Sequence, residues 1–300
     1  MNNTQFYPRV HMLPGPAGNY SGKIFYSGMD TQSWLYDPLL GTPIWQPFPA
    51  SVTHARRDYG NSLLLPATAT AGARVLIAGG QNTSANNYSK SLACSDRIGD
   101  LLQLCNILAS SEMINFGQTT PQWVSAGSMT TARVDANSVL MPDGKILVVG
   151  GENTCCSAQP AGVLDGEPTC LPVYTAELFD SATNSWLATG IPAPSATSAQ
   201  RPRQYHSTAV LLPDASVLLA GGDTDACQIP ANCTSQYPNT CPSGQIYKPG
   251  YFFRGARPTI TSAPSSITYG QTYTINTPNG AQVTKVLAVD PARSGHPCVR

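Results

Sequence analysis

The sequence predicts an all-β protein, made of a partial β-propeller of about four blades followed by the start of an Ig-like β-sandwich. Charged residues make up 11% of the 300 residues, and the chain has 26 glycines and 26 prolines, which favours short strands joined by turns over solvated helices. A glycine doublet recurs at constant spacing, at 79–80, 150–151 and 221–222. This pattern stops after residue 256, where a different alternation begins.

Four segments of the first 256 residues share one plan. Each has a polar or aromatic lead, an apolar run ending in Leu-Pro or Met-Pro, a turn, a second apolar run and a glycine. They are "YPRVHMLPGPAGNYSGKIFYSG" (7–28), "RRDYGNSLLLPATATAGARVLIAGG" (56–80), "RVDANSVLMPDGKILVVGG" (133–151) and "RQYHSTAVLLPDASVLLAGG" (203–222). Two short apolar runs separated by turn residues predict a β-hairpin in each segment.

A third strand and a tryptophan follow each of the first three segments. These stretches are "SWLYDPLLGTPIW" to Trp45, "SEMINFGQTTPQW" to Trp123 and "YTAELFDSATNSW" to Trp186. This order is typical of kelch repeats, each of which forms a four-stranded propeller blade. We expect the glycines to allow close packing near the propeller axis and each tryptophan to fill the wedge between neighbouring blades. Residues 1–256 are therefore predicted to form kelch-type blades of an incomplete propeller.

Residues 257–300 have a different pattern. The stretch "RPTITSAPSSITYGQTYTINTPNGAQVTKVLAVD" alternates apolar and polar residues, and Asn279-Gly280 is typical of a hairpin turn. A complete sandwich of this type needs about 100 residues. The sequence therefore predicts that residues 257–300 are the N-terminal part of a truncated Ig-like sandwich domain.

Charge and hydropathy exclude two classes of partner. Lys plus Arg and Asp plus Glu each number 17, and the sequence pI is near 6.9, so the positive surface of a nucleic-acid or anionic-membrane binder is not expected. No window of about 18 residues is apolar enough to span a membrane. The first residues lack a signal-peptide pattern. Either the protein is cytosolic, or this chain lacks its true start.

The nine cysteines favour a chain that lacks its true start over a cytosolic protein. They form no Cys-x-x-Cys pair, and most lie in polar, loop-like stretches, which favours disulfides formed in an oxidising compartment over metal sites. Cys94 with Cys105 and Cys227 with Cys233 are each expected to close a short loop. Five glycosylation sequons agree with this route. They begin at Asn2, Asn19, Asn82, Asn87 and Asn232. We expect a secreted, extracellular glycoprotein whose signal peptide is not in this chain.

The whole arrangement resembles the galactose oxidase and glyoxal oxidase family of copper radical oxidases. The motifs that carry the resemblance are "RQYHSTAVLLPD", "YPRVHMLP", "GQIYKPGYFFRGARPTITSAP" and "VLAVDPARSGHP". The resemblance implies that Tyr205, His206 and His296 hold Cu2+ and that Tyr205 acts as the catalytic general base. The family's radical tyrosine, cross-linked to a cysteine, has no counterpart in this chain. The chain thus resembles a C-terminal portion of such an oxidase, truncated at both ends.

The activity implied by the resemblance is oxidation of a small-molecule primary alcohol, aldehyde or carbohydrate by O2, with release of hydrogen peroxide. This chain alone is expected to be inactive, because the cross-linked Cys-Tyr cofactor is missing. An alternative is a non-catalytic, secreted kelch-propeller protein that binds glycans or cell-wall polymers through loops at one propeller face. A zinc hydrolase is less well supported by two histidines so far apart in the sequence.

Structural explanations compete for several of these residues. Tyr7 and Tyr59 precede their own Leu-Pro motifs much as Tyr205 does, so an aromatic at this place is partly a property of the repeat. His11 alternates with apolar residues and is expected to be structural. Consecutive strand residues point to opposite faces. Tyr205 and His206 can therefore share one ion only if the chain bends there.

Overall fold

The computed structural model describes residues 9–14, 20–27, 31–41, 44–51, 56–66, 72–82, 106–156, 169–189, 203–222, 244–268, 271–284 and 286. Every strand pairing in these residues is antiparallel. The helices among them are the short 3-10 segments η2 (Gly250–Phe253) and η3 (Gly280–Gln282). The predicted all-β fold is confirmed.

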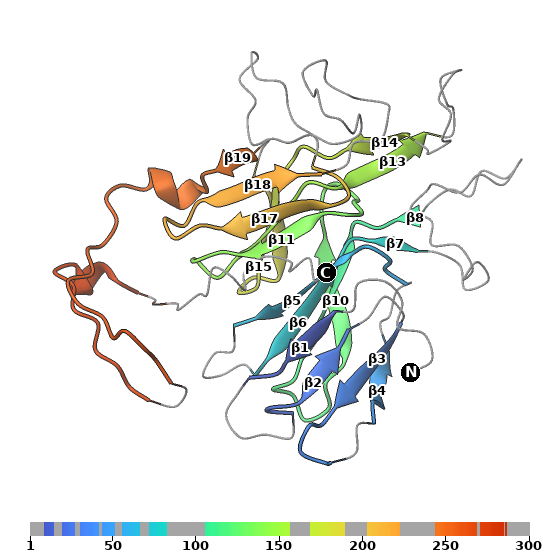
Figure 1. Cartoon of the computed structure of the whole chain (residues 1–300), viewed down its shortest axis with the longest axis horizontal. Coiled ribbons are helices and arrows are strands. Elements are labelled where there is room, and N and C mark those ends of the chain that lie inside the picture. The colour runs from blue at the N-terminus through green and yellow to red at the C-terminus, as the bar shows by residue number, and fades with distance from the viewer. Residues whose placement is uncertain are drawn as a thin grey trace, which may run out of the picture.

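Four sheets follow one another along the chain, and each forms one blade (Figure 1). The first contains β1 (Val10–Met12), β2 (Ile24–Tyr26), β3 (Gln32–Tyr36) and β4 (Gln46–Ser51). The second contains β5 (Asn61–Leu65), β6 (Arg74–Ala78), β9 (Ser110–Asn115) and β10 (Trp123–Ser128). The third contains β11 (Asn137–Leu140), β12 (Ile146–Val149), β15 (Glu177–Asp180) and β16 (Ser185–Ala188). The fourth contains β17 (Ser207–Leu211), β18 (Val217–Gly221) and β19 (Gly244–Tyr247).

Two small hairpins extend from the glycine doublets. They consist of β7 (Gln81–Asn82) with β8 (Asn106–Ile107), and β13 (Glu152–Cys156) with β14 (Thr169–Pro172). Strands β5, β11 and β17 begin successive blades and contact one another in the order of the chain, so they form the axial side of the stack. The predicted partial propeller is confirmed, and residues just before these three strands are brought toward one place.

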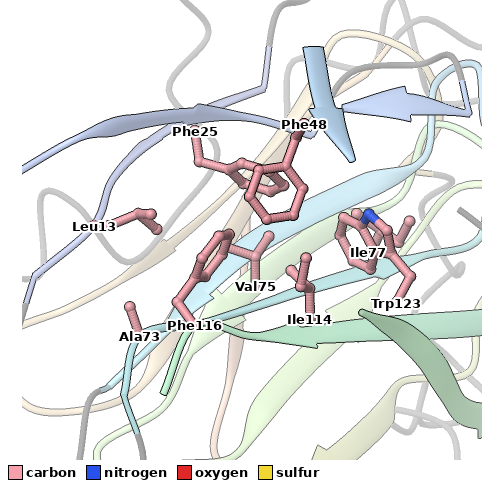
Figure 2. Close-up of a cluster of buried hydrophobic side chains, with 9 residues drawn as sticks. All are labelled: Leu13, Phe25, Phe48, Ala73, Val75, Ile77, Ile114, Phe116 and Trp123. Atoms are coloured by element: carbon pink, nitrogen blue, oxygen red, sulfur yellow. The ribbon is translucent and has the colours of Figure 1, made fainter. Parts of the chain in front are cut away.

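The hydrophobic core lies between blades, because each sheet buries apolar side chains on a face that meets its neighbour. Figure 2 shows the cluster between the first and second blades, where Phe25 and Phe48 meet Val75, Ile114 and Trp123. Leu76 and Phe179 belong to a second cluster, between the second and third blades. A third cluster joins the third and fourth blades. Each blade is thus stabilised mainly by the next one.

Glycine at the doublets is required by this packing. Gly79 has φ +66°, and a Cβ there would lie 2.6 Å from the backbone oxygen of Arg133 in the lead to the third blade. Gly80 N–H donates to the same oxygen at 2.9 Å. Gly151 N–H donates in the same way to the oxygen of Arg203, at 2.7 Å. The glycines therefore permit hydrogen bonds between neighbouring blades as well as close packing.

Tryptophan also joins neighbouring blades. The indole Nε1 of Trp123 in the second blade donates to Ser33 Oγ in the first at 3.0 Å, and Trp186 in the third blade donates to Ser111 Oγ in the second at 2.9 Å. Ala176 occupies the corresponding place in the third blade. The fourth blade has three strands among the described residues, and none of them brings a tryptophan to Ala176.

The segment after the blades extends away from them (Figure 1). Its described residues contain one isolated antiparallel bridge, between Ser262 and Asn276. The expected hairpin turn at Asn279-Gly280 is not formed, because Gly280 begins η3. The division of the chain into blades up to residue 256 and a sandwich beyond it stays a prediction. Among the described residues, no helix is long and apolar enough to cross a membrane.

Candidate functional site

Tyr205 and His206 lie in a tight turn that ends where β17 begins. Ser207 N–H donates to the Gln204 oxygen at 3.1 Å, which closes the turn. His206 has φ 59°, in the left-handed region that few non-glycine residues adopt. The chain therefore bends at this pair, and the two rings lie against each other with centroids 3.7 Å apart and planes tilted by 34°. A phenol and an imidazole are presented together instead of on opposite faces of a strand.

The turn is held by buried groups on both sides. The Arg203 guanidinium donates to the Gly221 oxygen at 2.8 Å, at the end of β18 that pairs with the start of β17. The Gln204 amide donates at 2.7 Å to the carboxylate of Glu152, in the β13–β14 hairpin that extends from the third blade. Arg203, Gln204 and Glu152 are each less than 5% exposed. The Tyr-His turn is thus anchored to two blades. The sequence did not single out Gln204 or Glu152.

An arginine introduces each of the second, third and fourth blades. Arg57 forms a 3.1 Å ion pair with Glu112, and Arg133 forms a 2.6 Å ion pair with Glu177. Burial lowers the pKa of both guanidinium groups, while the paired carboxylates oppose that shift. In the fourth blade, Gln245 pairs with Leu219 and occupies the position that a glutamate has in the second and third blades. These arginines hold the leads of the blades and hence the direction of the Tyr-His turn.

Tyr59 is a residue of the site that sequence reasoning did not assign to it. Tyr59, Asp135 and Tyr205 hold equivalent places just before β5, β11 and β17, and these strands converge on the axial side. The Tyr59 and Tyr205 rings meet edge to face, with centroids 6.1 Å apart and planes 85° apart. The one signal in the sequence was that Tyr59 and Tyr205 occupy the same aromatic position of the repeat. Their approach to each other depends on how the blades pack, which the sequence does not show.

His11 and His296 stand outside this cluster for different reasons. His11 Nε2 lies 2.7 Å from Ser62 Oγ between the first two blades, as expected of a structural histidine. His296 lies outside the described residues, and so do the cysteine pairs 94–105 and 227–233. Within the described part of the chain, no group of three or more His, Cys, Asp or Glu side chains could hold a metal ion. Phenolate oxygen and imidazole nitrogen are nevertheless donors that suit Cu(II).

Comparisons with known proteins point to one group of enzymes. The family model described as "Glyoxal oxidase N-terminus" matches residues 1–251. "Aldehyde oxidase GLOX1" of Arabidopsis thaliana is 27% identical over 173 residues, covering 54% of this chain and 25% of that protein. "Galactose oxidase" of Gibberella zeae strain PH-1 is 28% identical over 193 residues, covering 60% of this chain and 24% of that protein.

A solved structure is also similar to this chain. A fungal alcohol oxidase in complex with copper superimposes with a TM-score of 0.59 and 25% sequence identity, over 86% of this chain and 46% of that one. The chain therefore spans about a quarter of the length of the curated relatives that it matches, and under half of the solved structure.

Proposed function

The chain belongs to the glyoxal oxidase and galactose oxidase family of copper radical oxidases, and from this premise we propose that it is part of an enzyme that oxidises primary alcohols or aldehydes. O2 is the oxidant, and hydrogen peroxide is the second product. The observation that supports the proposal is the Tyr205-His206 turn, which presents a phenol and an imidazole side by side. A small-molecule alcohol, aldehyde or carbohydrate is the proposed substrate.

Each residue has a proposed role. Tyr205, His206 and His296 would hold the copper ion. Bound copper would supply one-electron redox chemistry that side chains lack. Tyr205 would accept the proton of the substrate hydroxyl as general base. Glu152, through Gln204, would fix the direction of the turn. We assign no residue of this chain to a cross-linked Cys-Tyr cofactor.

Copper titration tests the proposal on the chain itself. We expect weak Cu(II) binding, with a tyrosinate-to-copper absorption band that Tyr205→Phe abolishes and His206→Ala weakens. Tyr20→Phe, in the first blade, is the matched control and should leave the band unchanged. No peroxide is expected from this chain alone. A longer polypeptide with preceding blades should bind copper tightly and produce peroxide, and His296→Ala in it should lose most of its copper. A chain without any such band would refute the copper role of Tyr205.

A second candidate function has its own observation. A groove of about 730 Å³ lies between the third and fourth blades. It is lined in part by the aromatic rings of Tyr174, Tyr247 and Phe253 and by the cationic Lys248 and Arg254. Aromatic faces stack on sugar rings, and cations bind carboxylates. We propose glycan binding at this groove as the alternative function, whether or not the chain belongs to an active oxidase.

Retention on immobilised polygalacturonate distinguishes this alternative. Phe253→Ala and Arg254→Ala should each reduce retention, whereas Arg257→Ala, whose guanidinium stacks on Phe252 outside the groove lining, should not. Equal retention of all three variants, or none by the wild-type chain, would remove glycan binding at the groove from consideration.

We also propose that the protein is a secreted, disulfide-bonded glycoprotein. The cysteines in loop-like stretches and the sequons support this. Peptide mapping without reduction, on protein from a eukaryotic secretion host, should recover Cys94 linked to Cys105 and Cys227 linked to Cys233. Recovery of these four residues as free thiols would contradict the disulfides and weaken the secreted assignment.

A further inference from the structure

We propose that Tyr59 is a positioning residue for Tyr205, and that it sets the direction in which the Tyr205 phenol is presented. This inference rests on the proposed role of Tyr205 as a copper ligand. Tyr59 lies in the lead of the second blade and Tyr205 in the lead of the fourth. Their rings therefore meet across the axial side, past the third blade between them.

The backbone of Tyr59 is fixed before its ring is considered. Its carbonyl accepts a hydrogen bond from Asp135 N–H at 3.1 Å, which ties it to the third blade. The next residue, Gly60, donates to the Arg57 oxygen at 3.3 Å. A Cβ at Gly60 would lie 2.8 Å from the oxygen of Gly79. Tyr59 thus projects from a lead that packing and hydrogen bonds hold in one conformation.

A tyrosine is a costly choice at this place. Tyr59 has φ 52°, in the left-handed region, where a non-glycine residue is strained and uncommon. The equivalent Asp135 has φ 55°, and aspartate tolerates that region better than an aromatic residue does. Tyr59 also belongs to none of the three hydrophobic clusters found among the described residues. The hydrophobic clusters of the described residues therefore do not account for its ring.

The ring contact supplies a reason. The imidazole of His206 lies against the Tyr205 ring with centroids 3.7 Å apart and planes tilted by 34°, and the Tyr59 ring lies against it with centroids 6.1 Å apart, nearly perpendicular. Two neighbours at different angles restrict rotation of a ring more than one does. Without Tyr59, the Tyr205 side chain would keep the tilted contact with His206 and lose the edge-to-face contact. Its phenol oxygen would then sample more positions relative to His206.

The test compares Tyr59→Leu, which removes the ring, with Tyr59→Phe, which keeps it. An edge-to-face pair of this kind changes affinity by roughly 2- to 13-fold. We expect Tyr59→Leu to weaken Cu(II) binding by that factor and to shift or reduce the tyrosinate-to-copper band, while Tyr59→Phe behaves like wild type. Tyr36→Leu is the control, because the Tyr36 ring packs on Trp45 at 5.5 Å in the first blade, far along the chain from the site.

A second readout needs no copper. In the metal-free chain, nuclear Overhauser contacts between the Tyr205 and His206 rings should be strong in wild type and in Tyr59→Phe, and weaker in Tyr59→Leu. Melting temperatures of all variants show whether a substitution has destabilised the whole fold. If Tyr59→Leu and Tyr59→Phe melt alike, a difference in their ring contacts reports the loss of the Tyr59 ring.

The outcomes separate the two proposals. A wild-type chain without the tyrosinate band refutes the copper role of Tyr205, and the ring contacts then decide the positioning role alone. A band and ring contacts that are the same in wild type and Tyr59→Leu overturn the positioning role and leave the copper role standing. Equal losses in Tyr59→Leu and Tyr59→Phe would also overturn positioning by ring contact, because the hydroxyl would then be the group that matters.

Discussion

Two hairpin turns in neighbouring blades differ at the residue with a positive φ, which is glycine in one turn and alanine in the other. Gly144 turns the β11–β12 hairpin with φ 84°, and Ala215 turns the β17–β18 hairpin with φ 69°. The two turns have the same backbone hydrogen bonds, from Gly144 N–H to Met141 and from Ala215 N–H to Leu212. Tyr251 also donates its hydroxyl hydrogen bond to the Ala215 oxygen. The fourth blade thus keeps a strained residue where the third has a relaxed one.

Exchange of these two residues tests the strain. Ala215→Gly should raise the free energy of unfolding by about 1 kcal/mol, because glycine adopts a positive φ without a steric cost. Gly144→Ala should lower it by a similar amount. Urea unfolding of the two variants beside wild type measures both changes. Shifts of the same sign in the two variants would contradict the explanation from backbone strain.

The sequence predicts the position of these turns and little of the site around Tyr205. Pro213-Asp214 before Ala215 is enough to mark a turn. The bend at His206 could be stated only as a requirement for a shared ion, because the chain has no glycine there to signal it. The contact between Tyr59 and Tyr205 depends on three blade leads converging, and no local pattern records that.

Between elements, the blade leads are the main electrostatic connections. Arg133 is fully buried and also donates to the Thr175 oxygen at 2.8 Å, and Glu177 accepts a backbone N–H from Thr131 at 3.1 Å. The ion pair therefore joins the lead of the third blade to its own third strand. The sequence shows an arginine in each of these leads and a glutamate in two third strands, but the long insertions between them conceal the pairing.

Removal of one partner should be costly. Arg133→Met leaves the buried Glu177 carboxylate without its cation, which should lower the free energy of unfolding by about 3–5 kcal/mol. Arg74→Met is the control, since Arg74 is only half-buried and its guanidinium donates to the Ser181 oxygen at 3.3 Å. Chemical unfolding measures both. If Arg133→Met costs no more than the control, the ion pair is not what holds the lead.

A partly exposed ion pair gives a pH dependence. Lys145, beside the β11–β12 turn, pairs with Asp180 at the end of β15, and its hydrogen bond holds the pKa of Asp180 below the ordinary value. A lowered carboxylate pKa stabilises the fold above the unfolded-state pKa, and this stabilisation is lost as the pH falls through the folded-state pKa. Asp180→Asn should therefore reduce stability at neutral pH and flatten its decline in acid. Melting temperatures between neutral and acidic pH would show a parallel decline in both proteins if the pair contributed nothing.

At the scale of the molecule, apolar side chains remain exposed on the first and last blades. Met12 on β1 is 65% exposed, and Phe253 beside β19 is 76% exposed. Ile246 on β19 is also more than half exposed. The sequence predicted four blades from its repeats, and an open stack of blades leaves such faces uncovered. Exposed apolar surface of this kind favours association.

We expect the chain to bind a hydrophobic dye and to associate as its concentration rises. Met12→Lys together with Ile246→Lys should reduce both effects. Leu39→Lys is the control, because Leu39 is 92% exposed in a turn of the first blade and lies on neither strand. Light scattering and dye fluorescence test the expectation. A monodisperse monomer that melts cooperatively and binds no dye would contradict it.

The hydrogen bonds from Trp123 to Ser33 and from Trp186 to Ser111 make the blades non-interchangeable. Each serine accepts a hydrogen bond from the blade that follows it. The third blade has Ala176 at this place, and its side chain cannot accept one. A shuffled chain with a four-stranded, tryptophan-bearing blade placed after the third would bury an indole N–H opposite a methyl group. In such a rearrangement, Ala176→Ser would restore the missing hydrogen-bond acceptor. A single side chain in each blade thus helps to determine which blade can follow it.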